Sequence, residues 1–230
     1  MKGIIVNKYG GSDVLEYVDL REPIPEESQV LIEVHGASVN YADIKARKGD
    51  YHLGRALPFI PGLDVAGVVL DVGSEVTEIK PGDHVIAFPL TGSYAEQVVA
   101  SHSLTYIIPN SVDLRKAAAT TLVAGTATHM LRNLARIQAS ESLLVHTAAG
   151  GVGTTALKVA KALGVKQIFG SVGSSWKEAH VKKIGAIDVV DYNSETYPLV
   201  IRELTGDKGV DVILNPLGGL TIEKDLDCLA

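Results

Sequence analysis

The chain has 230 residues, of which 46% are hydrophobic and 21% charged, a balance typical of one large or two ordinary globular domains. Its formal net charge of -6 argues against nucleic acid as the main ligand, because a phosphate backbone favours a basic surface. The single cysteine, Cys228, excludes an internal disulfide and a thiolate metal cluster. No apolar run approaches the ~20 residues that cross a bilayer, and no cleavable leader is visible. We therefore expect a cytoplasmic protein that contacts no membrane.

The first part of the chain, residues 1–111, is predicted to be mostly β. Short β-branched runs alternate there with turn signals such as PIPEES and EIKPGD. The run from Val30 to Val34 alternates between one buried and one wetter face. One helix is predicted over Tyr41–Lys48, ended by Gly49.

The pattern changes after Asn110, where Asp113 can cap a helix over residues 114–125, with further helix in THMLRNLARIQ. Four apolar strands then alternate with helices, which predicts an α/β second domain, residues 112–230, with a doubly wound parallel sheet. The pattern of TIEKDLDCLA stops without a terminal Gly, Pro or basic turn. Since a full sheet of this type has about six strands, we expect a fragment or truncated form whose C-terminal part is missing.

The stretch HTAAGGVG has the spacing of a dinucleotide-binding turn, with Ala148, Gly150 and Gly153 in the three fingerprint positions. It follows a predicted strand and opens a predicted helix, the context in which a helix N-terminus holds a pyrophosphate. The alternative is an ordinary tight strand-to-helix turn. We expect dinucleotide binding by Gly150, Gly151, Val152 and Gly153.

The next strand ends in FGSVGSSWK, where NAD-binding proteins usually carry an acid that holds the ribose hydroxyls. Gly173 stands in that place, followed by Ser174 and Lys177. An acid would repel the 2′-phosphate of NADP, whereas a lysine attracts it. We therefore expect NADPH rather than NADH. The alternative is that these residues cap the following helix and that Lys177 is only solvated.

Several motifs in order carry a family resemblance, among them GASVNYADIKARKGDY, PFIPGLDVAG, AAGGVGTTALKVAKALG and KKIGAIDVVDY. Together they resemble the zinc-free, zeta-crystallin-like quinone oxidoreductase branch of the medium-chain dehydrogenases/reductases. The resemblance implies a GroES-like β-rich N-terminal domain, a Rossmann domain, and a homodimer for full-length members.

The resemblance also implies that no metal is bound. Zinc-dependent relatives carry a Cys where this sequence has Asn40, and a His where it has Leu63. Asn and Leu supply neither of the soft donors that a catalytic zinc needs.

The same resemblance assigns roles to individual side chains. Lys177 and Tyr192 would hold the 2′-phosphate, and Asn215 replaces an expected Asp on the nicotinamide side. Alternatives remain open, since Asn40 can cap the helix at 41, Asp43 can pair with a lysine, and Tyr192 can simply pack. The remaining implied roles are Asn40 beside the nicotinamide, with Tyr41 nearby, Tyr51 on the substrate side, and Thr126 on the cofactor.

The implied reaction is hydride transfer from NADPH to a quinone, with hydrogen bonds from Asn40, Tyr41 or Tyr51 polarising the acceptor. A small-molecule enone, or an enoyl double bond, is the alternative acceptor. From another class, a non-catalytic NADPH-binding protein is also consistent with the sequence.

Overall fold

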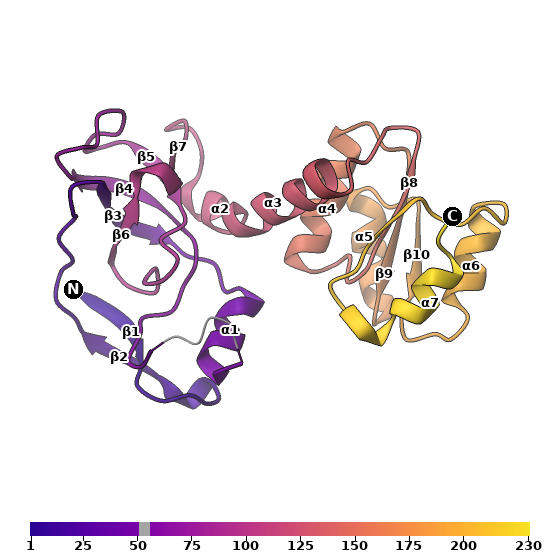
Figure 1. The fold of residues 1–230 in the computed structure, drawn as a ribbon, viewed down its shortest axis with the longest axis horizontal. Helices are drawn as coiled ribbons and strands as arrows, with labels where there is room; N and C mark the ends of the chain where they lie inside the picture. Colours follow the sequence, from indigo (N-terminus) through magenta and orange to yellow (C-terminus); the bar gives the residue numbers. More distant parts are fainter. Residues whose placement is uncertain (51–55) are drawn as a thin grey trace. The chain divides into compact units, whose positions relative to one another are not determined.

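The computed structural model describes residues 1–50 and 56–230, which form two compact units, Met1–Leu122 and Val123–Ala230 (Figure 1). The first unit ends later than residue 111, because helix α2 (Leu114–Ala118) packs on strands β3 (Gln29–Gly36) and β4 (Val65–Val72). Gly36 makes this contact possible, since a Cβ atom there would stand 2.9 Å from the Cβ of Ala118.

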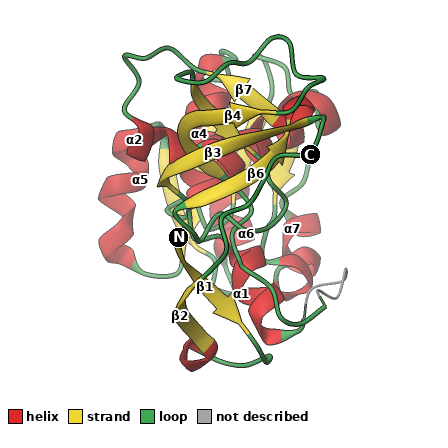
Figure 2. Ribbon diagram, turned by 90° about the vertical axis from the view of Figure 1, so that its left-hand side faces the viewer, coloured by secondary structure: helices red, strands yellow, loops and turns green. Residues whose placement is uncertain are grey.

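The first unit is built on an antiparallel sheet whose described strands lie in the order β6-β3-β4-β5-β7. Figure 2 labels β6, β3, β4 and β7 of this sheet. As the sequence predicts, Val30 and Ile32 of β3 are fully buried while Glu33 is exposed. A separate antiparallel pair, β1 with β2, completes the β structure described here. The bounds are β1 Lys2–Val6, β2 Leu15–Asp19, β5 His84–Ala87, β6 Gln97–Ser101 and β7 Thr105–Ile107, with single 3-10 turns at Ser12–Val14 and His102–Leu104.

Helix α1 (Tyr41–Lys48) has the predicted bounds. It begins where the carboxylate of Asp43 accepts the backbone N–H of Asn40 at 2.9 Å. It ends at Gly49, whose φ of 80° is the left-handed conformation that glycine adopts without a Cβ clash.

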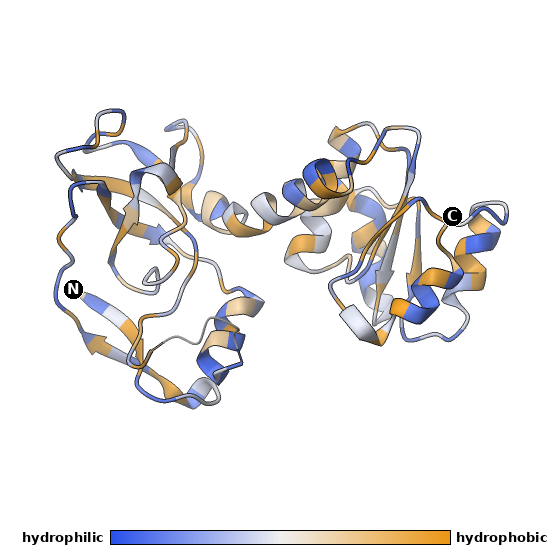
Figure 3. Ribbon diagram, in the orientation of Figure 1, coloured by the Kyte–Doolittle hydropathy of each residue, from blue (hydrophilic) through white to orange (hydrophobic). Residues whose placement is uncertain are grey.

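The second unit contains a parallel sheet whose described strands lie in the order β10-β9-β8-β11. Leu143 and Val145 of β8 face one hydrophobic cluster and Leu144 faces another, so both faces of the sheet are covered. Figure 3 shows the covering helices α6 and α7 with both hydrophilic and hydrophobic residues. The bounds are β8 Ser142–Val145, α4 Gly151–Ala162, β9 Gln167–Val172, α5 Glu178–Ile184, β10 Asp188–Asp191, α6 Tyr197–Leu204, β11 Val212–Leu214 and α7 Ile222–Asp227, with 3-10 turns at Ser175–Lys177 and Gly218–Leu220.

The helical stretch after Asp113 differs from the single helix predicted over residues 114–125. Asp113 caps α2 as predicted, accepting two backbone N–H groups, but α2 stops at Ala118 and α3 starts anew at Thr121 (Thr121–Thr128). The hydroxyls of Thr120 and Thr121 both donate to the carbonyl of Ala117, a local bond that bends helices. The further helix is a π-helical turn, His129–Leu134.

Candidate functional site

The glycine turn connects β8 to α4 at the carboxyl end of the sheet. Gly150 caps α4 in an extended conformation, and Gly150 and Gly151 are exposed. Gly153 is buried, and a Cβ atom there would stand 2.7 Å from the backbone Cα of Ala148. Only glycine therefore lets the helix approach the strand this closely.

The first turn of α4 leaves the N–H groups of Gly151, Val152 and Gly153 without helical partners and carries the positive end of the helix dipole. An exposed helix N-terminus of this kind, opened by small residues, fits a pyrophosphate. This arrangement therefore fits the dinucleotide that the sequence predicts.

The next strand along the sheet, β9, brings the predicted 2′-phosphate residues together. Gly173 follows β9, Tyr192 follows β10, and the backbone N–H of Tyr192 donates to the carbonyl of Val172 at 3.2 Å. A Cβ atom on Gly173 would stand 2.6 Å from the Cζ of Tyr192. Tyr192 thus fills the space that the acid of an NAD site would occupy.

Ser174 and Lys177 belong to the short 3-10 turn that follows Gly173. The Ser174 hydroxyl donates to the Gly173 carbonyl at 2.7 Å, and the Lys177 N–H donates to the Ser174 carbonyl at 3.1 Å. The Lys177 ammonium lies 5.2 Å from the ring centroid of the exposed Trp176. Among the described residues, no carboxylate forms an ion pair with Lys177, so its charge is available to an anion.

Thr126 and Asn215 occupy different surroundings. Thr126 lies in α3, one turn after Val123, whose side chain would stand 3.1 Å from a Cβ atom on Gly151. Asn215 follows β11 and holds its own loop, because its side-chain oxygen accepts the backbone N–H groups of Leu217 and Gly218. Its amide group donates to Asp225 at 2.6 Å.

In the first unit, Asn40 belongs to a buried polar cluster before α1. Its side-chain amide donates to the Ser38 hydroxyl at 2.9 Å and to the Asp64 carboxylate at 3.2 Å. Asp64 is completely buried and also accepts the Ser38 hydroxyl at 2.7 Å and the Leu122 N–H at 3.1 Å. The amide hydrogens of Asn40 are thus directed at Asp64 and Ser38.

The other acid of this cluster, Asp43, is also buried and is held by hydrogen bonds, not by the lysine that the sequence left open. It accepts the Gly62 N–H at 3.2 Å and the Tyr94 hydroxyl at 3.1 Å. Burial raises the pKa of the Asp43 carboxyl, although these hydrogen bonds oppose the rise. Burial and then the nearby Asp43 charge raise the pKa of Tyr94 well above its ordinary value.

Of the two tyrosines predicted near the acceptor, the structure describes Tyr41. Tyr41 is the first residue of α1 and is 73% exposed, so its hydroxyl is accessible to a ligand. Tyr51 lies outside the described residues.

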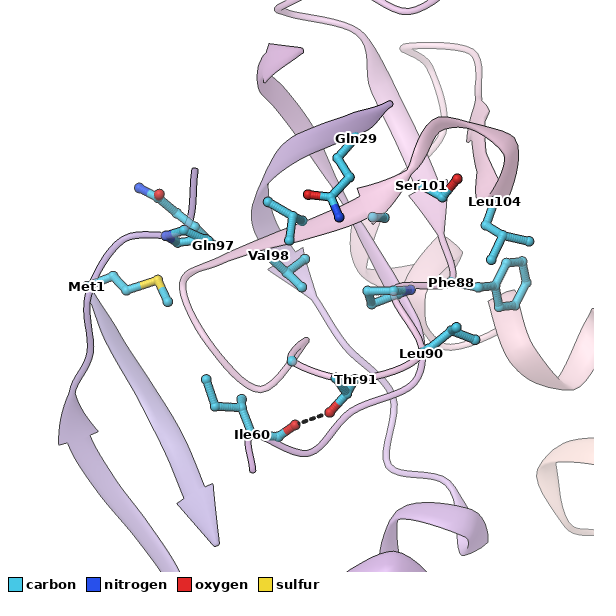
Figure 4. A pocket seen from close by; sticks show the side chains of 15 residues that line it. Met1, Gln29, Ile60, Phe88, Leu90, Thr91, Gln97, Val98, Ser101 and Leu104 are labelled. Atoms are coloured by element: carbon cyan, nitrogen blue, oxygen red, sulfur yellow. Dashed lines mark hydrogen bonds between the residues drawn. The ribbon is translucent and has the colours of Figure 1, made fainter. Parts of the chain in front are cut away.

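An apolar cavity of about 370 Å³ lies elsewhere in the first unit (Figure 4). The Thr91 hydroxyl crosses one side of it to the Ile60 carbonyl. Neither Asn40 nor Tyr41 lines this cavity, so it is separate from the residues predicted to meet the acceptor. Its side chains include Phe88, Leu90, Val98, Leu104, Gln29 and Gln97.

Among the described residues, no group of three or more His, Cys, Asp or Glu side chains is arranged to hold a metal ion. At the two positions that the family resemblance relates to zinc ligands, Asn40 and Leu63 supply no imidazole or thiolate. This donor set does not fit zinc. In the same residues, no helix combines the length and the apolar character needed to cross a bilayer.

Four further polar residues, two in each unit, hold the surroundings of these candidate residues and were not predicted. Asp64 and Tyr94 in the first unit, and His146 and Asp225 in the second, are all polar groups that the fold buries or half-buries. Asp64 directly precedes a continuous apolar strand, VAGVV, and His146 directly follows one, SLLV. For Asp64 and His146, the available signal was an ionisable residue adjoining a buried strand.

Comparison with known proteins gives the family. The family described as "Alcohol dehydrogenase GroES-like domain" matches residues 26–110, and "Zinc-binding dehydrogenase" matches residues 151–230. A quinone oxidoreductase of Rattus norvegicus is 39% identical over 232 aligned residues, covering all of this chain and 70% of that protein. The chain belongs to the quinone oxidoreductase family.

Solved structures of the quinone oxidoreductase family and its neighbours confirm the predicted α/β fold class. The Escherichia coli quinone oxidoreductase complexed with NADPH has a TM-score of 0.95 at 35% identity, covering this whole chain and 70% of that one. The CurK enoyl reductase has a TM-score of 0.91 at 28% identity, covering 100% of this chain and 71% of that one.

Proposed function

We propose that this chain is an NADPH-dependent reductase that transfers a hydride to a quinone without a metal ion. The observation that carries the proposal is the set of groups at the carboxyl ends of β8, β9 and β10. The open N-terminus of α4 suits a pyrophosphate. Lys177 follows four positions after Gly173, which contacts Tyr192, and has no ion-pair partner among the described residues, so it suits an added phosphate. The NADPH complex of the Escherichia coli relative supports this choice of cofactor.

In this proposal the cofactor supplies the hydride, and the chain supplies binding and orientation. The backbone N–H groups of Gly151, Val152 and Gly153 hold the pyrophosphate. The Lys177 ammonium neutralises the 2′-phosphate, and the Tyr192 hydroxyl donates a hydrogen bond to it. The Ser174 hydroxyl exchanges its bond to the Gly173 carbonyl for one to the phosphate. Thr126 contacts the cofactor from α3. Asn215 shapes the loop on the nicotinamide side.

On the acceptor side, we assign orientation of the nicotinamide to Asn40 and hydrogen bonding to the acceptor to Tyr41 and Tyr51. Asp64 and Ser38 hold the side-chain amide of Asn40 in one orientation. A quinone is already electron-poor, and a hydrogen bond from a tyrosine supplies the polarisation it needs. We also propose a cytoplasmic location, which the single unpaired cysteine supports.

Reduction of an enone or enoyl double bond is the second candidate, and its support is the likeness to the CurK enoyl reductase. The same cofactor groups serve both reactions, so the acceptor alone distinguishes them. A chain that binds NADPH tightly and reduces neither acceptor would be a non-catalytic binding protein.

The test compares Lys177→Ala with Lys183→Ala, an exposed lysine on α5 of the same unit. Dissociation constants for NADPH and NADH are measured by fluorescence titration, and NADPH oxidation is followed with 1,4-benzoquinone and an enone. Removing a charge-assisted bond of about 1.5–3 kcal/mol should weaken NADPH binding ~10-fold or more and leave NADH binding unchanged. Lys183→Ala should change neither constant.

Equal loss of NADPH and NADH affinity in Lys177→Ala would contradict the phosphate role of Lys177. Faster turnover of the enone than of the quinone would favour the second candidate function, reduction of an enone or enoyl double bond.

A further inference from the structure

His146 connects the glycine turn to the interior of the second unit. It directly follows β8, is completely buried, and uses both ring nitrogens. Its Nδ1 lies 2.5 Å from the Ser171 hydroxyl of β9, and its Nε2 lies 2.6 Å from the Asp225 carboxylate of α7. Because an ionised carboxylate only accepts hydrogen bonds, Nε2 carries a proton.

Asp225 is the centre of this network and collects donors from several elements. Besides His146, the Tyr197 hydroxyl donates to it at 2.7 Å and the Asn215 amide at 2.6 Å. The Thr221 hydroxyl lies 3.4 Å away. A buried carboxylate satisfied in this way keeps α6, α7 and the loop after β11 in fixed positions about His146.

The residue after His146 has an unusual backbone. Thr147 has a φ of 48°, a left-handed conformation that is unfavourable for a β-branched residue. In this conformation its carbonyl accepts the Gly150 N–H at 2.8 Å, and the neighbouring Ala148 N–H donates to the Ser171 carbonyl at 2.9 Å. Such a conformation persists only where the surrounding structure imposes it, and the residue directly before Thr147 is the one held by both Ser171 and Asp225.

We propose that His146, held by Ser171 and Asp225, is a positioning residue that keeps the strained turn at Thr147 in the shape that receives the cofactor pyrophosphate. This inference rests on the proposed function, since it concerns the same cofactor. It also explains why a buried histidine and a buried acid lie behind a turn that itself carries no charged side chain. Loosening either bond of His146 lets Thr147 relax, breaks the contact of its carbonyl with the Gly150 N–H, and moves the N–H groups of Gly151, Val152 and Gly153 away from the ligand.

The test uses two variants and a matched control. Ser171→Ala removes the hydroxyl at Nδ1, and His146→Gln retains a donor toward Asp225 but loses the Ser171 bond. The control is Ser142→Ala, a buried hydroxyl at the opposite end of β8 that donates to Asp211 at 2.7 Å. Each change is also combined with Thr147→Gly, because glycine adopts a positive φ without strain.

Dissociation constants for NADPH, the KM for 1,4-benzoquinone, and urea unfolding are measured for every variant. Ser171→Ala and His146→Gln should raise the NADPH constant ~3–10-fold, the equivalent of one hydrogen bond, with an unchanged KM for the quinone. Thr147→Gly should restore most of that affinity in both. Ser142→Ala should lower resistance to urea while its NADPH constant stays that of the unchanged chain.

An NADPH constant in Ser171→Ala equal to that of Ser142→Ala would overturn the inference, and so would a loss that Thr147→Gly does not restore. If the unchanged chain binds no NADPH, the proposed function fails, and this inference fails with it. If the unchanged chain binds NADPH and the variants bind it with the same dissociation constant, the inference about His146 is overturned and the proposed function stands.

Discussion

The ring of Tyr192 lies against the α-carbon of Gly173, in the space that any side chain at position 173 would need. The missing acid of the NAD fingerprint therefore has a packing reason as well as an electrostatic one. Even an uncharged side chain at Gly173 would displace a residue proposed to bind the 2′-phosphate.

Gly173→Ala and Gly173→Asp separate these two effects. Alanine displaces Tyr192 without adding charge, so we expect a few-fold weaker NADPH binding. Aspartate adds repulsion of the 2′-phosphate, and we expect about tenfold further loss for NADPH but not for NADH, equivalent to ~1.4 kcal/mol. Fluorescence titration with both cofactors checks this. Equal NADPH constants for the two variants would show that charge at this position has no effect.

Asp64→Asn should destabilise the first unit. The buried carboxylate accepts donors from Ser38, Asn40 and Leu122, and an amide in its place turns a donor toward some of them. We expect a loss of about 2–4 kcal/mol in the free energy of unfolding, measured by urea denaturation. The control is Asp71→Asn, an exposed acid of β4, which should change that free energy by less than about 0.5 kcal/mol.

Tyr94 should make the first unit sensitive to alkali. Burial and the Asp43 charge raise its pKa above the ordinary value of 10.0, so the folded state holds the phenol proton more tightly than the unfolded state. That contribution is fully present below about pH 10 and is lost as the pH rises toward the folded pKa.

The unfolding free energy of Tyr94→Phe should therefore fall less between about pH 8 and pH 11 than that of the unchanged chain. At about pH 8 the variant should be ~1 kcal/mol less stable, because the bond to Asp43 is lost.

Tyr197→Phe is the counterpart in the second unit, since burial and its bond to Asp225 also raise the pKa of Tyr197. Parallel pH curves for Tyr94→Phe and the unchanged chain would contradict the prediction.

The elements that the sequence predicted well are those whose signals are local. Helix α1 has the predicted bounds because a polar residue before it and Gly49 after it mark its ends. The four parallel strands follow from apolar runs separated by turns. The break between α2 and α3 was missed, because threonine hydroxyls that bond back to Ala117 have the same sequence signal as threonines inside a helix.

The geometry of the candidate site was predictable where a motif fixes the backbone shape and less so where distant residues meet. The glycine turn and the group Gly173, Ser174 and Lys177 each lie in one short stretch. The network that joins His146 to Asp225 spans 79 positions of the chain, so no local pattern carries it. The roles of Asn40, Tyr41 and Tyr51 remain predictions.

Cys228 makes local opening of the second unit measurable by thiol labelling. The thiol is completely buried against the sheet, and burial, with the nearby Asp225 charge, raises its pKa to about 11. Since it is the single cysteine of the chain, a thiol reagent at neutral pH can react only with molecules in which this face of the sheet has opened. The rate of thiol labelling therefore reports how often this face of the sheet opens. Any ligand that stabilises the second unit against opening will slow the labelling.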